Sequence, residues 1–331
     1  MADQFKAAID PQALLREQVR WRWIETIFWL AVLLPFWVTP TYLVLCSQIA
    51  IAALFALSLD LIVGYSGLVS LGHAAFFGVG AYAAGLLAKH GWGEPISGLA
   101  VAALAATVVG YLTSFIIVRI GQFALIMVTT GLGLLLFELA NSAHDITGGD
   151  DGLQGIRMWP VFNYFRFDLY GYTAYAYSLA VLFVCFLVLR RLINSPFGLS
   201  LRGIRENPRR MPAIGAPSRS HIRKIYVISA AVAGLAGGLS AQTTAFVALD
   251  ALSFQRSAEV LVMLILGGAG RLYGGLIGAT IFIVARDQLA GMNPQYWYFW
   301  LGLLLIAVII FLPNGILGGV AQLLSRKGRS S

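Results

Sequence analysis

Long stretches without charged residues constrain this chain more than any other feature of its sequence. Asp, Glu, Lys and Arg are absent from residues 26–59, 61–88, 95–118, 120–137, 169–189, 225–249 and 288–325. A helix that crosses a hydrocarbon core of about 30 Å needs about 20 apolar residues. A charge at the centre of such a helix costs about 2.5 to 3.5 kcal/mol. The pattern therefore predicts a membrane protein that crosses the bilayer many times.

Composition supports helices as the crossing elements. Of the residues, 59% are hydrophobic and 11% are charged, about half the charged fraction of a typical soluble domain. The apolar runs are continuous, whereas the strands of a membrane β-barrel would alternate over about 10 residues. The first 22 residues are polar and show no short apolar core with a cleavage site, so we expect no cleaved signal and a cytoplasmic amino terminus.

The net charge of +8 is concentrated in one loop rather than spread over a surface that would attract nucleic acid. Residues 191–224 and the adjoining Arg190 hold nine basic residues against one acid, Glu206. Such an excess marks the cytoplasmic side. The loop at 141–172 holds four aspartates against two arginines, so we expect it to be periplasmic.

These charges and runs predict an all-α polytopic membrane protein with about ten crossings. We expect an interfacial amphipathic segment at 1–23, a transmembrane domain at 24–318 and a cytoplasmic tail at 319–331. The expected crossings are 24–39, 42–63, 68–88, 96–118, 121–140, 173–190, 225–247, 257–270, 274–290 and 296–313. The segment 257–270 is short, so its glycine-rich end should be buried against neighbouring helices.

Two glycine-rich tracts, Gly64–Tyr82 and Gly267–Gly278, lie within or beside the expected crossings. Interrupted helices in the two halves of a transporter often frame its translocation path, and their similar placement indicates an internal pseudo-repeat. The alternative is tight helix packing alone, which small residues also permit. The candidate path residues are Ser66, Gly67, Ser70, Gly72, His73, Gly267, Gly268, Gly270, Gly274 and Gly275.

His73 is the one histidine expected within the bilayer, with Ser66 and Ser70 on the same expected helical face. An intramembrane polar residue is a functional candidate by default. The competing interpretation is an imidazole satisfied by a backbone carbonyl or a serine. A second histidine or a nearby cysteine, which a metal site would need, is missing from this tract.

The acidic residues of the crossings are expected at span ends, where a solvated carboxylate is the ordinary explanation. They are Asp60, Glu138, Glu259 and Asp287. The sequence therefore gives little support to proton coupling.

The basic loop contains a second helix signal. Asn207 is a suitable N-cap, Pro208 fits a first helical turn, and Gly215 is a suitable stop. A short cytoplasmic helix of this kind could dock into a groove of a soluble partner, or the loop could serve only as a positive-inside anchor. The chain has no phosphate-binding Gly-x-x-x-x-Gly-Lys motif, so we expect it not to hydrolyse ATP and not to be an enzyme.

The run from Ser66 to Tyr82 resembles the signature of LivM-type permeases of branched-chain amino-acid ABC transporters. Four further segments resemble the same family: Thr147–Leu153, Arg202–Gly215 followed by Lys224–Gly238, Leu266–Gly275 and Pro313–Gly318. The resemblance implies a bacterial inner-membrane subunit with both termini cytoplasmic. Its implied partners are the lipid bilayer, a second related permease, two cytoplasmic ATPases that carry ATP and Mg, and a periplasmic substrate-binding protein.

The resemblance also implies residue roles. The ATPase-coupling residues would be Arg202, Arg205, Glu206, Asn207, Arg209, Ala213 and Gly215. The contacts with the binding protein would be Thr147, Gly148, Asp150 and Asp151. Pro208, Arg210 and Pro212 depart from the family pattern, and Pro212 would remove a backbone hydrogen bond from the expected short helix.

The function implied is ATP-driven import of branched-chain or other hydrophobic amino acids. Related permeases for urea, short amides or aromatic acids share these motifs, so the cargo stays open. A secondary transporter or channel built from interrupted helices is the alternative of a different class.

Overall fold

The computed structural model describes residues 23–38, 40–162, 164–168, 170–208, 210–311 and 315–319, and helices dominate this part of the chain. The α-helices are α2 (Trp23–Ala31), α3 (Pro35–Val38), α4 (Leu43–Asp60), α5 (Ala74–Lys89), α6 (Pro95–Ile117), α7 (Gln122–Ser142), α8 (His144–Thr147), α9 (Tyr172–Ile193), α10 (Pro196–Glu206), α11 (Ser218–Thr244), α12 (Phe254–Gly267), α13 (Leu272–Met292) and α14 (Trp297–Phe311). A π-helical turn, η2 (Leu61–Tyr65), extends α4, and the 3₁₀ turns are η1 (Pro40–Tyr42), η3 (Gly149–Asp151), η4 (Pro212–Ile214) and η5 (Leu249–Leu252).

Six of these helical segments are long and apolar enough to cross a membrane. They are Pro40–Tyr65, Pro95–Ile117, Gln122–Ser142, Tyr172–Ile193, Ser218–Thr244 and Leu272–Met292. The chain is therefore a multi-pass helical membrane protein, as the charge-free runs predicted. The 16 residues of α5 give only about 24 Å of helix, and the 14 residues of α12 about 21 Å.

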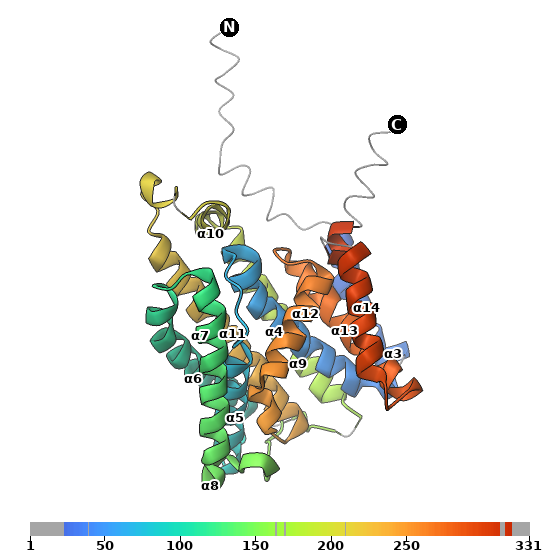
Figure 1. Ribbon diagram of the computed structural model, residues 1–331. Coiled ribbons are helices and arrows are strands. Elements are labelled where there is room, and N and C mark those ends of the chain that lie inside the picture. The colour runs from blue at the N-terminus through green and yellow to red at the C-terminus, as the bar shows by residue number, and fades with distance from the viewer. Residues whose placement is uncertain are drawn as a thin grey trace, which may run out of the picture.

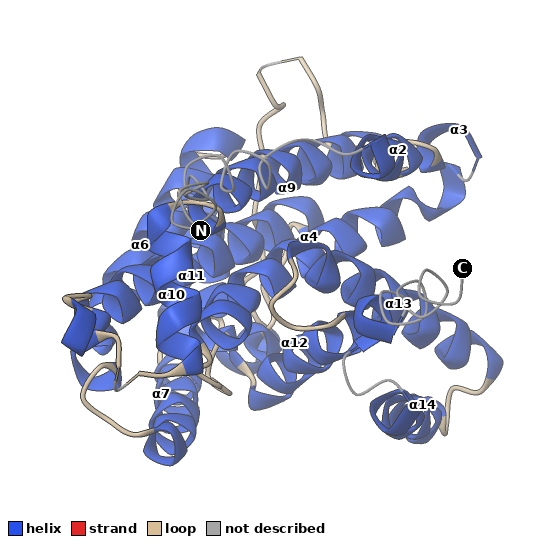
Figure 2. Cartoon of the chain, turned by 90° about the horizontal axis from the view of Figure 1, so that it is seen from above, coloured by secondary structure: helices blue, strands red, loops and turns tan. Residues whose placement is uncertain are grey.

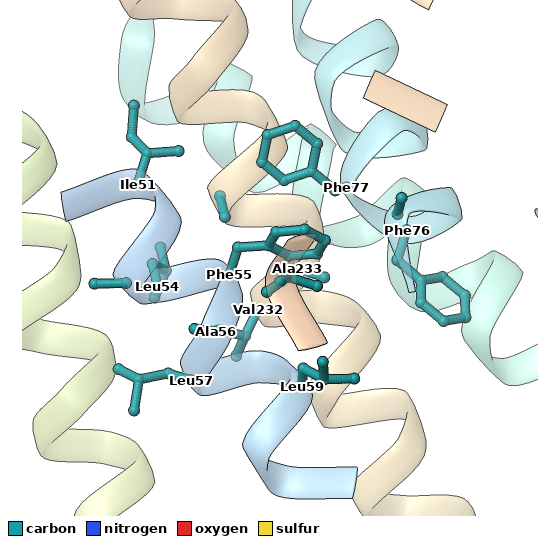
Figure 3. Close-up of a cluster of buried hydrophobic side chains, with 14 of the residues drawn as sticks. Ile51, Leu54, Phe55, Ala56, Leu57, Leu59, Phe76, Phe77, Val232 and Ala233 are labelled. Carbon is teal, nitrogen blue, oxygen red and sulfur yellow. The ribbon is translucent and has the colours of Figure 1, made fainter. Parts of the chain in front are cut away.

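Helix α11 forms the centre of the molecule. It packs against α4, α5 and α6, while α4 also contacts α9 and α13. Seen from above, α4 and α11 lie in the middle, with α9 and α2 along one edge and α13 and α14 towards another (Figure 2). The core at this centre is built from apolar side chains of α4, α5 and α11, among them Leu54, Phe55, Phe77 and Val232 (Figure 3).

The outward faces of α6 and α7 are apolar. Leu104 and Leu112 of α6 and Phe123 and Met127 of α7 are each more than 60% exposed. Water would penalise this exposure, but lipid tails are as apolar as leucine, and a partner helix could also cover these faces. The exposure therefore fits the membrane environment that the sequence predicts.

The two charged loops lie at opposite ends of the molecule. Figure 1 shows α8, from the acidic loop, at one end and α10, from the basic loop, at the other. Arg190, counted with the basic loop, is in fact a buried residue of α9 and forms an ion pair of 2.6 Å with Glu25 of α2. This pair fastens α2 to the bundle at the basic-loop end.

Two expected crossings differ in detail. The helix expected over 68–88 begins only at Ala74, and the expected crossing 24–39 consists of two short helices, α2 and α3. The interfacial segment, apart from Trp23, and the tail beyond Gly319 lie outside the described residues.

Candidate functional site

The chain leaves regular helix between Tyr65 and Ala74, and we call residues 67–73 the first break. Non-helical backbone at membrane depth is tolerated only where other groups satisfy it. The side chain of Gln122 donates to the Gly67 carbonyl at 3.0 Å, and the Leu71 N–H donates to Thr129 Oγ1 at 3.4 Å. The Ala74 N–H, at the start of α5, donates to Ser257 Oγ at 2.9 Å. Helices α7 and α12 therefore hold the first break in place.

Glycine at position 72 allows α7 to lie directly against this break. A Cβ atom at Gly72 would lie 1.8 Å from the carbonyl oxygen of Thr129. Any other residue at position 72 would push α7 away and lengthen the contact between Leu71 and Thr129.

The second glycine tract forms a matching interruption, and we call residues 268–271 the second break. It separates α12 from α13, and both Gly268 and Gly270 have positive φ. A Cβ atom at Gly267 would lie 1.8 Å from the carbonyl oxygen of Gly274, so the two helices meet at backbone distance. Gly267 and Gly268 are buried, as the short crossing at 257–270 predicted.

The two breaks are joined by a group of four residues, the bridging cluster: Asp60, Gly64, Arg205 and Gly270. Asp60 is fully buried, and its Oδ1 accepts a hydrogen bond of 2.7 Å from the Gly270 N–H. The Arg205 guanidinium, at the end of α10, donates to the Gly64 carbonyl. The Arg205 side chain also lies close to Gly67, where a Cβ atom would come within 2.9 Å of its Cγ. The cluster connects both glycine tracts to the basic loop.

The burial of Asp60 corrects our expectation of a solvated carboxylate at a span end. Its place explains the difference, because the carboxylate caps a backbone N–H of the second break rather than reaching water. One sequence signal could have revealed this. Gly64 follows Asp60 by one helical turn, and a small residue there leaves room for a buried partner.

His73 is also fully buried. Its Nε2 lies 2.8 Å from Ser58 Oγ, and its ring stacks on Phe55 with centroids 5.6 Å apart. Ser229 of α11 in turn donates to the Ser58 carbonyl. These contacts match the interpretation of an imidazole bonded to a serine, although Nδ1 has no partner among the described residues, and they tie the first break to α4 and α11.

The serines near His73 do not form the expected helical face with it. Because the first break is not helical, Ser66 Oγ instead donates to the Ile62 carbonyl at 2.7 Å, and buried Ser70 points elsewhere without a partner among the described residues. Among the described residues, no group of three or more His, Cys, Asp or Glu could hold a metal ion.

The helix in the basic loop lies one segment earlier than predicted. It is α10, which begins at Pro196 and ends at Glu206, with Asn207 at its carboxyl end rather than at an amino end. Its buried residues Gly198, Leu201 and Ile204 follow helical spacing, so one face of α10 rests on the bundle. Pro212 starts the short turn η4, so it removes no hydrogen bond from a helix, and Gly215 ends the turn with positive φ.

The predicted coupling residues are therefore divided. Arg202, Arg205 and Glu206 lie on α10, while Asn207, Ala213 and Gly215 lie in the turns after it, and Arg209 lies outside the described residues. The Arg202 guanidinium lies over the ring of Tyr65, 5.5 Å from its centroid. Arg202 and Arg205 thus both reach the end of the α4 segment.

The residues predicted to contact a binding protein lie at the opposite end. Asp150 and Asp151 are exposed on η3. Thr147 is buried, and its hydroxyl donates to the Ala140 carbonyl at 2.5 Å, so its role is to shape the turn before Gly148. Nearby, Leu153 and Val247 exchange backbone hydrogen bonds of 2.9 and 3.2 Å, which fastens the acidic loop to the end of α11.

The fold and the site together define a multi-pass helical membrane protein with interrupted helices that meet inside the bundle, an arrangement typical of transporters. Residues 41–309 match the family described as branched-chain amino acid transport system / permease component. The chain therefore belongs to this family of permeases.

Several curated proteins resemble the chain. The high-affinity branched-chain amino acid transport system permease protein LivM of Escherichia coli K12 is 30% identical over 310 residues, covering 87% of this chain and 72% of that protein. The corresponding LivH protein of the same organism is 25% identical over 281 residues, covering 80% and 91%. A probable LivM protein of Methanocaldococcus jannaschii is 27% identical over 163 residues, covering 44% and 47%. No solved structure matches the chain significantly.

Proposed function

We propose that this chain is the LivM-type permease subunit of an ATP-driven ABC importer for branched-chain amino acids in a bacterial inner membrane. Family membership and the similarity to LivM support the class and the cargo. The observation that carries the mechanism is the bridging cluster, because Arg205 of α10 contacts the first glycine tract directly and adjoins the second. A movement of α10 would therefore reach both breaks.

The proposed assembly follows from the charge distribution and the relatives. The basic loop faces the cytoplasm, the acidic loop faces the periplasm, and ten helical segments cross, with the first break supplying the length that α5 lacks. Similarity to both LivM and LivH supports a second, related permease as partner. Two ATPases bind at the basic-loop end, and a substrate-binding protein contacts Asp150 and Asp151.

Helix α10 is the proposed docking element for an ATPase. Its outer face exposes Leu199 at 57%, and η4 beside it exposes Ile214 at 75%. Apolar residues rimmed by charge, as here by Arg205 and Glu206, mark protein interaction sites. Arg205 would then transmit the position of α10 to Gly64.

Two variants test this coupling. Replacing Glu206 together with Arg209, or Leu199→Glu alone, should abolish transport-coupled ATP hydrolysis in reconstituted vesicles, because the docking face is lost. The chain should still insert into the membrane, since Leu199 and Glu206 are exposed. Arg119→Ala, in the exposed turn after α6, is the matched control and should couple normally.

Three outcomes would each overturn a different part of the proposal. Unchanged coupling of ATP hydrolysis to transport in both docking variants would contradict the proposal that α10 docks an ATPase. Failure to recover any ATPase with the purified chain, together with import that does not need ATP, would favour the secondary-transporter or channel class instead. Import of urea, short amides or aromatic acids but not leucine would keep the class and change the cargo.

A further inference from the structure

A cavity of about 420 Å³ opens at the acidic-loop end of the bundle, away from the bridging cluster. Helices α4, α11, α12 and α13 form most of its walls, and α5, α9 and the loop before α9 complete them. Its volume falls within the range of about 300 to 1,000 Å³ that is usual for small-molecule sites. The cavity is thus large enough for one amino acid with a few waters.

The mouth of the cavity is charged and polar. Arg256, Arg286 and Asp168 line it, together with Gln48. Arg256 is engaged by Glu259 at 3.4 Å and Asp250 at 3.9 Å. Arg286 is half-buried and forms no ion pair with any carboxylate in the described part of the chain. Its guanidinium is therefore available to an anionic group within the cavity.

An anion and a cation are both accommodated at this mouth. The Asp168 carboxylate accepts hydrogen bonds of 3.1 and 3.3 Å from the backbone N–H groups of Thr173 and Tyr172 at the start of α9. These bonds hold the carboxylate in place and leave lone pairs for an ammonium group. The mouth thus offers opposite charges, one on α13 and one on an exposed loop residue bonded to the start of α9, as a zwitterion requires.

The floor of the cavity is apolar. Ile51, Phe55, Phe77, Val260 and Met263 line it, and all five are buried. Figure 3 shows the Phe55 and Phe77 rings next to each other. Phe55 lies seven residues, or about 10 Å of helix, further along α4 than Gln48, and Ile51 lies between them. The ring of Phe55 is supported from beneath by its stack on His73.

We propose that this cavity is a binding site for the transported amino acid within the permease itself. Arg286 binds the α-carboxylate, Asp168 meets the α-ammonium group, and the Ile51, Phe55 and Met263 floor receives an aliphatic side chain. The inference rests on the proposed function. It adds that the permease recognises the cargo at the acidic-loop face, so the soluble binding protein does not carry all of the selectivity.

Equilibrium binding tests the site. The complete importer, in lipid nanodiscs without the binding protein, is titrated with tritiated L-leucine in a scintillation proximity assay. Saturable binding is expected, and L-leucinamide, which lacks the carboxylate, should compete at least about tenfold more weakly because it loses the charge-assisted bond. Arg286→Gln should weaken leucine binding by a similar factor, and Arg286→Lys should restore part of it.

Matched variants separate carboxylate recognition from general damage. Arg157→Gln, the same substitution at an exposed arginine of the acidic loop, should bind leucine like the unaltered protein. Ala52→Phe, which fills the cavity from α4, should weaken binding of leucine more than binding of alanine. Gel filtration and basal ATP hydrolysis of each complex report whether it has assembled.

The inference and the proposed function fail in different ways. Absence of saturable leucine binding up to millimolar concentration, or equal competition by leucinamide, overturns the site even when vesicles import leucine with ATP. Unchanged binding by Arg286→Gln also overturns it. Vesicles that do not import leucine overturn the proposed cargo, whatever the cavity binds.

Discussion

Asp60 and Gly64, one helical turn apart, together allow a carboxylate to be buried: Asp60 provides it, and Gly64 leaves room for its hydrogen-bond donor. The carboxylate needs a donor because a buried charge without partners costs several kcal/mol, and the Gly270 N–H supplies one. The donor reaches the carboxylate only because position 64 has no side chain. A Cβ atom there would lie 1.9 Å from Asp60 Oδ1 and 2.4 Å from the Gly270 nitrogen.

Gly64→Ala should therefore be destabilising although alanine favours helix. We expect a loss of about 1 to 3 kcal/mol, since overpacking at this site also separates Asp60 from Gly270. Thermal unfolding of the purified chain in detergent measures it. Gly131→Ala is the control, because a Cβ at that exposed position of α7 meets nothing within 4 Å. Equal melting temperatures for the two variants would contradict the close approach.

Residue types alone drew attention to polar residues of the apolar runs but did not predict their contacts. His73 was predicted with either a functional or a satisfied role, and the structure supplies Ser58, which is distant in sequence and carries no signal of its own. Asp60 was misjudged because its partner is a backbone N–H. Every residue except proline has such a group, so no pattern of side chains identifies it.

Helix boundaries depend on hydrogen-bonding partners from other helices as much as on the length of the apolar run. The first break continues the apolar run with Leu68, Val69 and Leu71, so hydropathy predicts helix through it. The chain departs from helix because Gln122, Thr129 and Ser257 replace the missing backbone hydrogen bonds. Those side chains come from other helices, which a single sequence does not place.

Removing one of these hydrogen-bonding side chains should loosen the first break without unfolding the bundle. Gln122→Leu deletes the bond to the Gly67 carbonyl, so amide hydrogen exchange in residues 67–73 should become faster, while exchange in the middle of α11 stays unchanged. Mass spectrometry after deuterium labelling measures both. Thr130→Val is the control, because the Thr130 hydroxyl bonds only to its own helix at Ile126. Equal exchange rates of residues 67–73 in the two variants would contradict the role of Gln122 of α7 in holding the first break.

The position of the helix in the basic loop, at 196–206 rather than at the predicted 207–215, also depends on packing. Ser195–Pro196 and Asn207–Pro208 are both good helix starts, and only the first is followed by residues that can bury one face against α9 and α11. The two helix-start signals have comparable local strength, so packing against the bundle decides which of them begins a helix. Pro212, which departs from the family pattern, begins the turn η4 and therefore interrupts no α-helix.

At the scale of the whole molecule, charge predicted correctly that the two loops lie apart. Apolar length likewise predicted a helical bundle, and six of its helices are long enough to cross. The cavity beneath the acidic loop could not be foreseen. Its walls come from six helices that are distant in sequence, and Arg286 becomes a candidate only once its neighbours in the cavity are known.

The orientation of the bundle can be measured directly. In a background with Cys46 and Cys185 replaced by serine, Asp145→Cys should react with a membrane-impermeant maleimide added to intact cells. Ala213→Cys should react only after the cells are permeabilised, because both positions are exposed but lie at opposite ends. The reverse labelling pattern would invert the topology and place the basic loop outside.

The hydrogen bond between Asp60 and Gly270 also has a consequence for biosynthesis. Its two residues are 210 positions apart. At roughly 5 to 20 residues per second, a ribosome needs about 10 to 40 s to deliver the second after the first. During that interval α4 holds a carboxylate whose final donor does not yet exist, so the nascent chain depends on water or the insertion machinery to shelter it. A chain truncated before the second break would keep that exposed defect permanently and be a natural target for membrane proteases.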